Sequence, residues 1–153
     1  LHFTIHSFPT RRSSDLGWAL SLLEPIAINR RAGRSAVRQV IEQGRARLAA
    51  GRWVVVFPEG TRIPAGQKGR YRLGGAVLAC ATGAKVVPVA HNAGEFWPKH
   101  GFRKRPGCIR VRIGQPIDTS GLKAEELIAQ VESWIEGQMP TLSHASASRA
   151  SAA

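Results

Sequence analysis

The segment from Val54 to Arg62 places the strongest limit on how this chain can fold. Three valines and Phe57 form an apolar run, and Pro58 ends it because proline cannot donate to a sheet ladder. β-Branched side chains suit a pleated, buried surface, so we predict a buried strand at residues 53–57. Four polar residues follow directly: Glu59, Gly60, Thr61 and Arg62. They therefore lie at the strand's C-terminal end, where open α/β sheets bind ligands.

These four residues indicate recognition of an anion that also carries a hydroxyl group. Arg62 suits phosphate because its planar guanidinium donates two hydrogen bonds and stays charged. Gly60 lets backbone amides approach the same anion, and Thr61 offers a hydroxyl donor. Glu59 would repel phosphate, so it suits a substrate hydroxyl or an arginine that it holds in place. The alternative is that Glu59 and Arg62 form a purely structural ion pair at the base of a loop.

Helices are expected to alternate with strands in the rest of the chain. A helix is predicted from Ser35 to about Ala50, where Gly51 ends it. Further helices are expected at about residues 73–81 and 122–136, strands at 85–90 and 108–113, and a long loop at 58–71. This order predicts the α/β class, with a mixed, partly parallel sheet flanked by helices.

One domain is expected over residues 17–140. Residues 1–16 show neither a helical nor a strand period and resemble a spurious translated leader, so we interpret them as an artefact or a disordered terminus. The Ser/Ala-rich residues 141–153 are predicted to be disordered. No apolar run approaches the roughly 20 residues that span a bilayer, although the chain could still lie on a membrane.

The charge of the chain favours polyanionic partners. Its 22 Lys and Arg residues against 10 Asp and Glu give a formal net charge of +12. Nucleic acid, anionic lipid and phosphorylated substrates all fit this excess, while genomic base composition is the alternative source of the many arginines. Basic residues gather around positions 68–72 and 99–105, and Phe96, Trp97 and Phe102 near the second group favour a membrane interface. The cysteines lack metal-ligand spacing, so no metal site is expected.

Four short motifs resemble the signature blocks of the glycerolipid acyltransferases, the family that includes the 1-acylglycerol-3-phosphate acyltransferases. Phe57–Arg62 resembles the third block, Ile28–Arg30 the second and Val86–Val89 the fourth. Tyr71–Ala76 resembles the basic, glycine-containing segment that opens the helix after the third block. The order and spacing of the blocks also agree, and the resemblance covers about residues 17–136.

The resemblance implies acyl transfer from acyl-CoA or acyl carrier protein to the sn-2 hydroxyl of 1-acyl-glycerol-3-phosphate, which gives phosphatidic acid. No cofactor besides the acyl donor is implied. Arg30 and Arg62 would grip the glycerol phosphate, while Glu59, Gly60 and Thr61 would shape the acceptor pocket. Val87 and Pro88 would line the pocket on the acyl side. The implied partners are lysophosphatidic acid, the acyl donor and an anionic membrane surface, at the cytoplasmic face of the bacterial inner membrane.

The family's first block is missing from this sequence. In the family a histidine, followed five positions later by an aspartate, acts as general base on the glycerol hydroxyl. None of the five histidines here has an aspartate at that position. The resemblance therefore predicts an N-terminally truncated, C-terminal part of such an enzyme, without a catalytic pair and inactive by itself. His91 is expected to be a pocket-wall or structural residue, because no nearby aspartate supports it as a replacement base.

Three other functions remain open at this stage. The first is an acyltransferase with another acceptor, such as glycerol 3-phosphate or a lyso-ornithine lipid. The second is a non-catalytic remnant that binds phosphate or lipid. The third is a basic nucleic-acid-binding domain, which is disfavoured because no recognition helix is visible and the arginines are scattered. Nucleic acid is therefore not expected among the partners.

Overall fold

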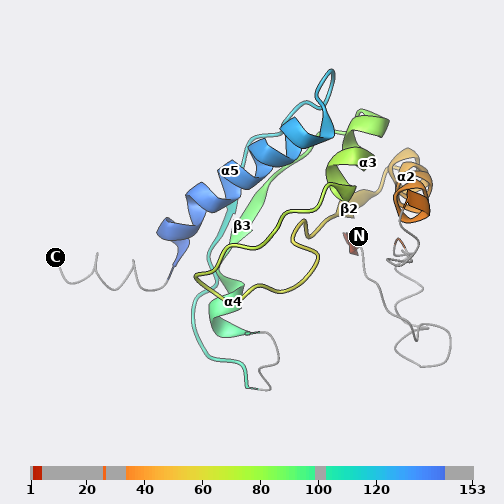
Figure 1. The fold of residues 1–153 in the computed structure, drawn as a ribbon. Coiled ribbons are helices and arrows are strands. Elements are labelled where there is room, and N and C mark those ends of the chain that lie inside the picture. Colours follow the sequence, from red (N-terminus) through yellow and green to blue (C-terminus); the bar gives the residue numbers. More distant parts are fainter. Residues whose placement is uncertain (1, 5–25, 27–33, 99–102, 144–153) are drawn as a thin grey trace, which may run out of the picture.

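The computed structural model describes residues 2–4, 26, 34–98 and 103–143 (Figure 1). Its helices are α2 (Arg34–Ala49), α3 (Gly74–Thr82), the short α4 (Ala93–Phe96) and α5 (Ala124–Leu142). Its strands are β1 (His2–Thr4), β2 (Trp53–Val55), β3 (Val89–His91) and β4 (Val111–Ile113). The helices predicted from Ser35 and from residue 73 are confirmed within one residue at each end.

The described strands form two separate pairs. β1 and β2 run parallel, with Phe3 opposite Val54, whereas β3 and β4 run antiparallel, with Ala90 opposite Arg112. An isolated bridge between Val86 and Ile117 continues the second pair. The α/β class and the mixed strand directions are therefore confirmed, although the described strands make two ladders rather than one sheet.

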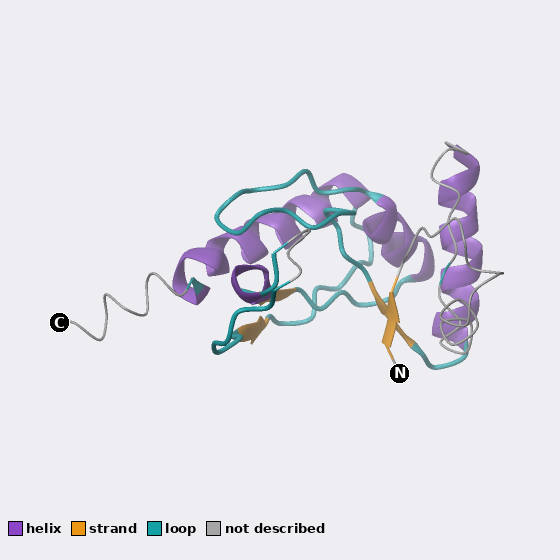
Figure 2. Ribbon diagram, turned by 90° about the horizontal axis from the view of Figure 1, so that it is seen from below, coloured by secondary structure: helices purple, strands orange, loops and turns teal. Residues whose placement is uncertain are grey.

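The core lies between α3 and α5. Ala76 and Ala79 of α3 pack against Leu127 and Val131 of α5, and Leu127 is completely buried. α2 packs on the other side of α3 and lies beside β2. Figure 2 shows the β1–β2 pair between α5 and α2. The C-terminal end of β2 and the loop that follows it therefore lie at the side of this core.

Several boundaries differ from the sequence prediction. α5 extends to Leu142, so residues 141 and 142 are helical rather than disordered, and residues 144–153 lie outside the described residues. His2–Thr4, within the presumed leader, pairs with β2. β2 and β3 are shorter than expected and only partly buried, since Trp53 and Val89 are 70% and 44% exposed. All three residues of β4 are exposed, so this strand contributes no buried side chain to the core.

Asn92 ties together three elements that lie far apart in the sequence. Its side chain is buried and donates to the Leu142 carbonyl at 3.0 Å. Its Oδ1 accepts a hydrogen bond from the Arg110 amide at 2.8 Å. This polar group is therefore satisfied in the core, and it fixes the start of α4 against the end of α5. Among the described helices, none has the length and apolar character needed to cross a membrane.

Candidate functional site

Residues 58–72, which we call loop 58–72, carry most of the predicted site residues. The Arg72 amide donates to the Pro58 carbonyl at 2.8 Å, so the two ends of the loop are held together. The Gly60 amide donates to the Phe57 carbonyl at 3.0 Å, and Gly60 has φ 68°. Glycine adopts this left-handed conformation without strain, which explains a glycine at the turn. Figure 1 shows the loop running from β2 toward α4.

One side of the loop, its acidic side, is anchored on α5. The Tyr71 hydroxyl donates to Glu136 Oε1 at 3.0 Å, and Lys68 Nζ lies 2.7 Å from Glu132 Oε1. Glu132 and Glu136 are four residues apart and therefore lie on the same face of the helix. The half-buried Glu59 lies near the same cluster. The acidic side thus consists of Glu59, Lys68, Tyr71, Glu132 and Glu136.

The acidic side perturbs the protonation of two of its members. Partial burial, and to a smaller extent the charge of Glu136, raises the pKa of the Glu59 carboxyl above its ordinary value of 4.5. Burial and the hydrogen bond to Glu136 also raise the pKa of the Tyr71 hydroxyl. Tyr71 therefore remains a hydrogen-bond donor at neutral pH, and Glu59 resists ionisation more than an exposed glutamate does.

A second part of the loop, which we call its basic side, contacts the segment after α4. The Arg62 guanidinium carbon lies 4.8 Å from the centre of the Trp97 ring, and Lys104 Nζ lies 4.3 Å from the same ring. Within the described part of the chain, neither cation forms a salt bridge with a carboxylate. The basic side thus consists of Arg62, Trp97 and Lys104.

The basic side contributes little to folding. The charge centres of Arg62 and Lys104 are separated by no more than the sum of their distances to the ring, about 9 Å. At this largest separation the two charges repel each other by about 0.5 kcal/mol in a water-like dielectric, and the repulsion is larger at any shorter separation. A cation–π contact at an exposed site contributes about 0.5–1 kcal/mol. The attraction and the repulsion are therefore similar in size, and an anion that joined the two cations would remove the repulsion.

The predicted site residues are only partly brought together. Glu59, Gly60, Thr61 and Arg62 lie in the loop as expected, but no salt bridge joins Glu59 to Arg62 among the described residues. The structural ion pair considered as an alternative is therefore wrong. Arg30 lies outside the described residues.

Val87 and Pro88 directly precede β3 in the chain. Pro88 is buried, and its carbonyl accepts a hydrogen bond from the Gly114 amide at 2.9 Å. A Cβ at Gly114 would approach Pro88 Cγ at 2.8 Å and the Trp134 ring at 2.8 Å, so this proline packs toward α5. Val87 is half-buried. Their role as the acyl-side lining of the pocket stays a prediction.

The residues that contact loop 58–72 from α5 and from the segment after α4 were not predicted from the sequence. Tyr71 and Glu136 are 65 positions apart, and only the Glu132–Glu136 spacing on one helix face hints that α5 receives a loop. Trp97 and Lys104 stood out only as part of a basic, aromatic stretch. His91 is exposed, and its Nδ1 accepts a hydrogen bond from the Ala93 amide at 3.3 Å, in agreement with a structural role.

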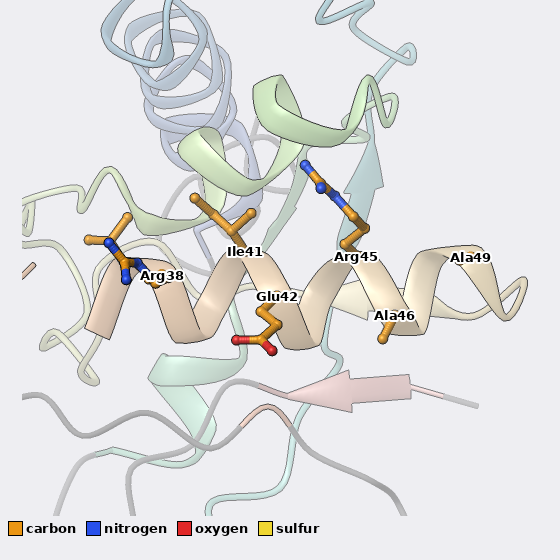
Figure 3. A pocket seen from close by; sticks show the side chains of 7 residues that line it. Arg38, Ile41, Glu42, Arg45, Ala46 and Ala49 are labelled. Atoms are coloured by element: carbon orange, nitrogen blue, oxygen red, sulfur yellow. The ribbon is translucent and has the colours of Figure 1, made fainter. Parts of the chain in front are cut away.

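A hollow of about 650 Å³ lies along α2 and does not coincide with the loop (Figure 3). Its lining residues are Val37, Arg38, Ile41, Glu42, Arg45, Ala46 and Ala49, all from this one helix. Arg45 points toward α3, where it donates to the Ala81 carbonyl at 3.2 Å. Polar groups from several elements do not converge there, so we do not assign the site to it. Likewise, no cluster of metal-ligating side chains occurs among the described residues.

The sequence of the chain is similar to those of known proteins. A model of the family described as Acyltransferase matches residues 12–92, more than half of the chain. A 1-acyl-sn-glycerol-3-phosphate acyltransferase of Pseudomonas aeruginosa is 46% identical over 130 residues, which cover 83% of this chain and 51% of that protein. A chloroplastic 1-acyl-sn-glycerol-3-phosphate acyltransferase of Arabidopsis thaliana is 33% identical over 127 residues, covering 81% of this chain and 35% of that protein.

A solved structure agrees with these sequence matches. The crystal structure of the 1-acyl-sn-glycerophosphate acyltransferase of Thermotoga maritima superposes with a TM-score of 0.73 at 27% sequence identity. The superposition covers 92% of this chain and 56% of that one. The chain therefore spans about half of the Pseudomonas and Thermotoga proteins, and about a third of the Arabidopsis protein.

Proposed function

This chain belongs to the acyltransferase family, and on that premise we propose that it forms the acceptor-binding part of a 1-acyl-sn-glycerol-3-phosphate acyltransferase. The reaction transfers an acyl group from acyl-CoA or acyl carrier protein to the sn-2 hydroxyl of lysophosphatidic acid and yields phosphatidic acid. The relatives are 1-acyl-sn-glycerol-3-phosphate acyltransferases, which supports lysophosphatidic acid as acceptor. We propose no cofactor beyond the acyl donor.

The observation that carries this proposal is the position of Arg62. The residue follows a strand end, lies in a loop whose ends are hydrogen-bonded together, and contacts the same indole ring as a second cation, Lys104. An exposed guanidinium that forms no salt bridge with the described carboxylates is available for a phosphate monoester. Glu59, on the other side of the loop, is then free of the phosphate and can accept a hydrogen bond from the glycerol portion.

The proposed chemistry requires a general base, and the His-x4-Asp pair that supplies it in the family does not occur in these 153 residues. In the proposed reaction the sn-2 oxygen attacks the thioester carbonyl, a histidine takes the hydroxyl proton, and the thiolate leaves as the ester forms. Because no histidine here precedes an aspartate by five positions, we propose that the 153-residue polypeptide binds the acceptor without transferring the acyl group.

The test is a fusion that restores a His-x4-Asp block upstream of Gly17, taken from a family member that has one. We expect the fusion to form phosphatidic acid from lysophosphatidic acid and oleoyl-CoA, and the 153-residue chain to form none. Arg62→Ala in the fusion should raise KM for lysophosphatidic acid about tenfold or more, equivalent to about 1.4 kcal/mol, without changing KM for oleoyl-CoA. An inactive fusion, or an unchanged KM, would refute the proposal.

We also propose that the protein works at an anionic membrane surface on the cytoplasmic side. The formal charge of +12 and the exposed Trp97 beside basic residues support this placement. Co-sedimentation with vesicles that contain phosphatidylglycerol should decrease as salt rises, and vesicles of phosphatidylcholine alone should retain little protein. Equal binding to both kinds of vesicle would argue against an electrostatic membrane contact.

A further inference from the structure

The geometry points to Trp97 as the residue that positions Arg62, and to Lys104 as the second cation of the same phosphate-monoester site. The inference rests on the proposed function, because it names the partners of Arg62 in the site that binds the acceptor. It adds Lys104 to the grip on the phosphate expected from Arg30 and Arg62, and the role of Arg30, which lies outside the described residues, stays a prediction. Trp97 acts through Arg62 and is therefore a positioning residue.

The backbone of Trp97 is held in place, and its ring contacts the Arg62 guanidinium. Its amide donates to the Ala93 carbonyl at 3.0 Å, and its neighbour Phe96 is buried, so the backbone beneath the ring is held by α4. Trp97 is 48% exposed, and Arg62, which lies 4.8 Å from the ring centre, is also exposed and therefore accessible to a ligand. A long arginine side chain loses rotamer freedom when it binds an anion, and a ring that restricts it beforehand lowers that cost.

Lys104 reaches the same ring because the chain after α4 returns to it. The Arg105 amide donates to the Phe96 carbonyl at 2.8 Å. Nearby, the chain at Gly107 passes so close to the Phe96 ring that a Cβ there would collide with it. These two contacts hold the backbone on either side of this turn close to α4, and Lys104 Nζ lies 4.3 Å from the centre of the Trp97 ring. The backbone therefore brings Lys104 within reach of the ring, and the cation–π contact orients its ammonium group.

The ligand that suits this pair is a phosphate monoester. It carries a charge of about −1.5 to −2 at neutral pH and presents three acceptor oxygens. A guanidinium donates two parallel hydrogen bonds to such a group, while an ammonium adds a compact point charge. The acceptor's own phosphate and the 3′-phosphate of an acyl-CoA donor share this chemistry, so the site is defined by the phosphate and the two sources are separated by experiment.

The experiment is isothermal titration of the purified 153-residue chain with glycerol 3-phosphate. Trp97→Leu and Lys104→Gln should each weaken binding about fivefold or more. The conservative variants Trp97→Phe and Lys104→Arg should stay within about twofold of the wild type, because they keep an aromatic face and a cation. Lys68→Gln removes an exposed lysine of the same loop that is paired with Glu132, and it is the matched control that should leave binding unchanged.

The outcomes separate this inference from the proposed function. Loss of binding in Arg62→Ala together with wild-type binding in both Trp97→Leu and Lys104→Gln overturns the inference and leaves the proposed function intact. Wild-type binding by Arg62→Ala overturns both. Circular dichroism shows whether Trp97→Leu is folded. If it is not, Lys104→Gln, which changes only an exposed side chain, tests whether a second cation contributes to phosphate binding. Wild-type binding by a folded Lys104→Gln then overturns the two-cation site.

A competition arm identifies the source of the phosphate. Coenzyme A and dephospho-coenzyme A differ by the 3′-phosphate alone. If coenzyme A competes with glycerol 3-phosphate and the dephospho form does not, the site also accepts the donor's phosphate. If neither competes, the site belongs to the acceptor. Both results support a phosphate-monoester site, whereas equal competition by the two forms contradicts it.

Discussion

The two sides of loop 58–72 differ in how their charges are balanced. On the acidic side, Tyr71 donates to Glu136, and Lys68 pairs with Glu132, so polar groups there have partners on α5. On the basic side, Arg62 and Lys104 share one indole ring and form no salt bridge with any described carboxylate. Tyr71 and Lys68 therefore have partners on α5, whereas the two cations of the basic side have no carboxylate partner among the described residues.

This difference assigns different roles to neighbouring residues. Satisfied polar contacts hold the loop on the core and stabilise the fold. Unbalanced cations stabilise the fold very little, and they gain most when an anion arrives. We therefore expect substitutions on the acidic side to change stability and substitutions on the basic side to change binding. The following predictions test that separation, from the largest expected effect to the smallest.

Charge reversal on the basic side should have the largest effect. Arg62→Glu replaces a phosphate donor with a carboxylate, and we expect glycerol 3-phosphate binding to fall by about 100-fold or more. The melting temperature should change by no more than about 2 °C, because Lys104 is left to pair with the new carboxylate. Titration and thermal unfolding check both parts. A much lower melting temperature would show that Arg62 stabilises the fold, and it would contradict the separation of roles between the two sides of the loop.

Removal of the Tyr71 hydroxyl should act on stability instead. Tyr71→Phe leaves a half-buried Glu136 without its donor, and we expect the free energy of unfolding to fall by about 1 kcal/mol. Urea denaturation measures this change, and a double-mutant cycle with Glu136→Gln assigns it to the pair. Acceptor binding should stay within twofold of the wild type. Strong loss of binding with unchanged stability would place Tyr71 in the binding site.

Glu59→Gln should raise stability in a pH-dependent manner. The pKa of Glu59 is raised in the folded state, so its favourable contribution is complete below the unfolded value near 4.5 and is lost as pH rises through the folded value. A glutamine stays neutral at all pH values. We therefore expect the variant to match the wild type at pH 4 and to be more stable at pH 7, as measured by urea denaturation. A variant that is less stable at pH 7 would contradict the sign of this shift.

The exposed ion pair should matter least. Lys68 is 58% exposed, and pairs of this kind are screened by solvent. Lys68→Gln should lower the melting temperature by about 1 °C or less, and added salt should remove the difference. A larger loss that persists in high salt would show that this pair anchors the loop more strongly than Tyr71 does.

Local features of the sequence predicted the loop well. Pro58 marks the end of the β-branched run, and Gly60 adopts the left-handed conformation that its position in a turn requires. The helix α2 follows from the spacing of its apolar residues, and α3 follows from a short apolar run that Gly83 ends with φ 67°. These outcomes depend on residues within a few positions of one another, which is why a pattern search finds them.

Contacts between distant segments could not be predicted in this way. The pairing of His2–Thr4 with β2 depends on a partner far along the chain, and three residues carry too little pattern to indicate a strand. The end of α5 is similar. The Ser/Ala-rich composition predicts disorder, but burial of Leu142 and its bond from Asn92 extend the helix. Likewise, no periodicity links Arg62 to Trp97.

We propose, above all, that the basic side of loop 58–72 recognises the acceptor's phosphate. The most direct test compares kcat/KM for lysophosphatidic acid with kcat/KM for the matching monoacylglycerol in the fusion enzyme. We predict that Arg62→Ala reduces this ratio about tenfold or more, whereas Tyr71→Phe leaves it unchanged. An unchanged ratio in Arg62→Ala, or an equal fall in both variants, would contradict the claim.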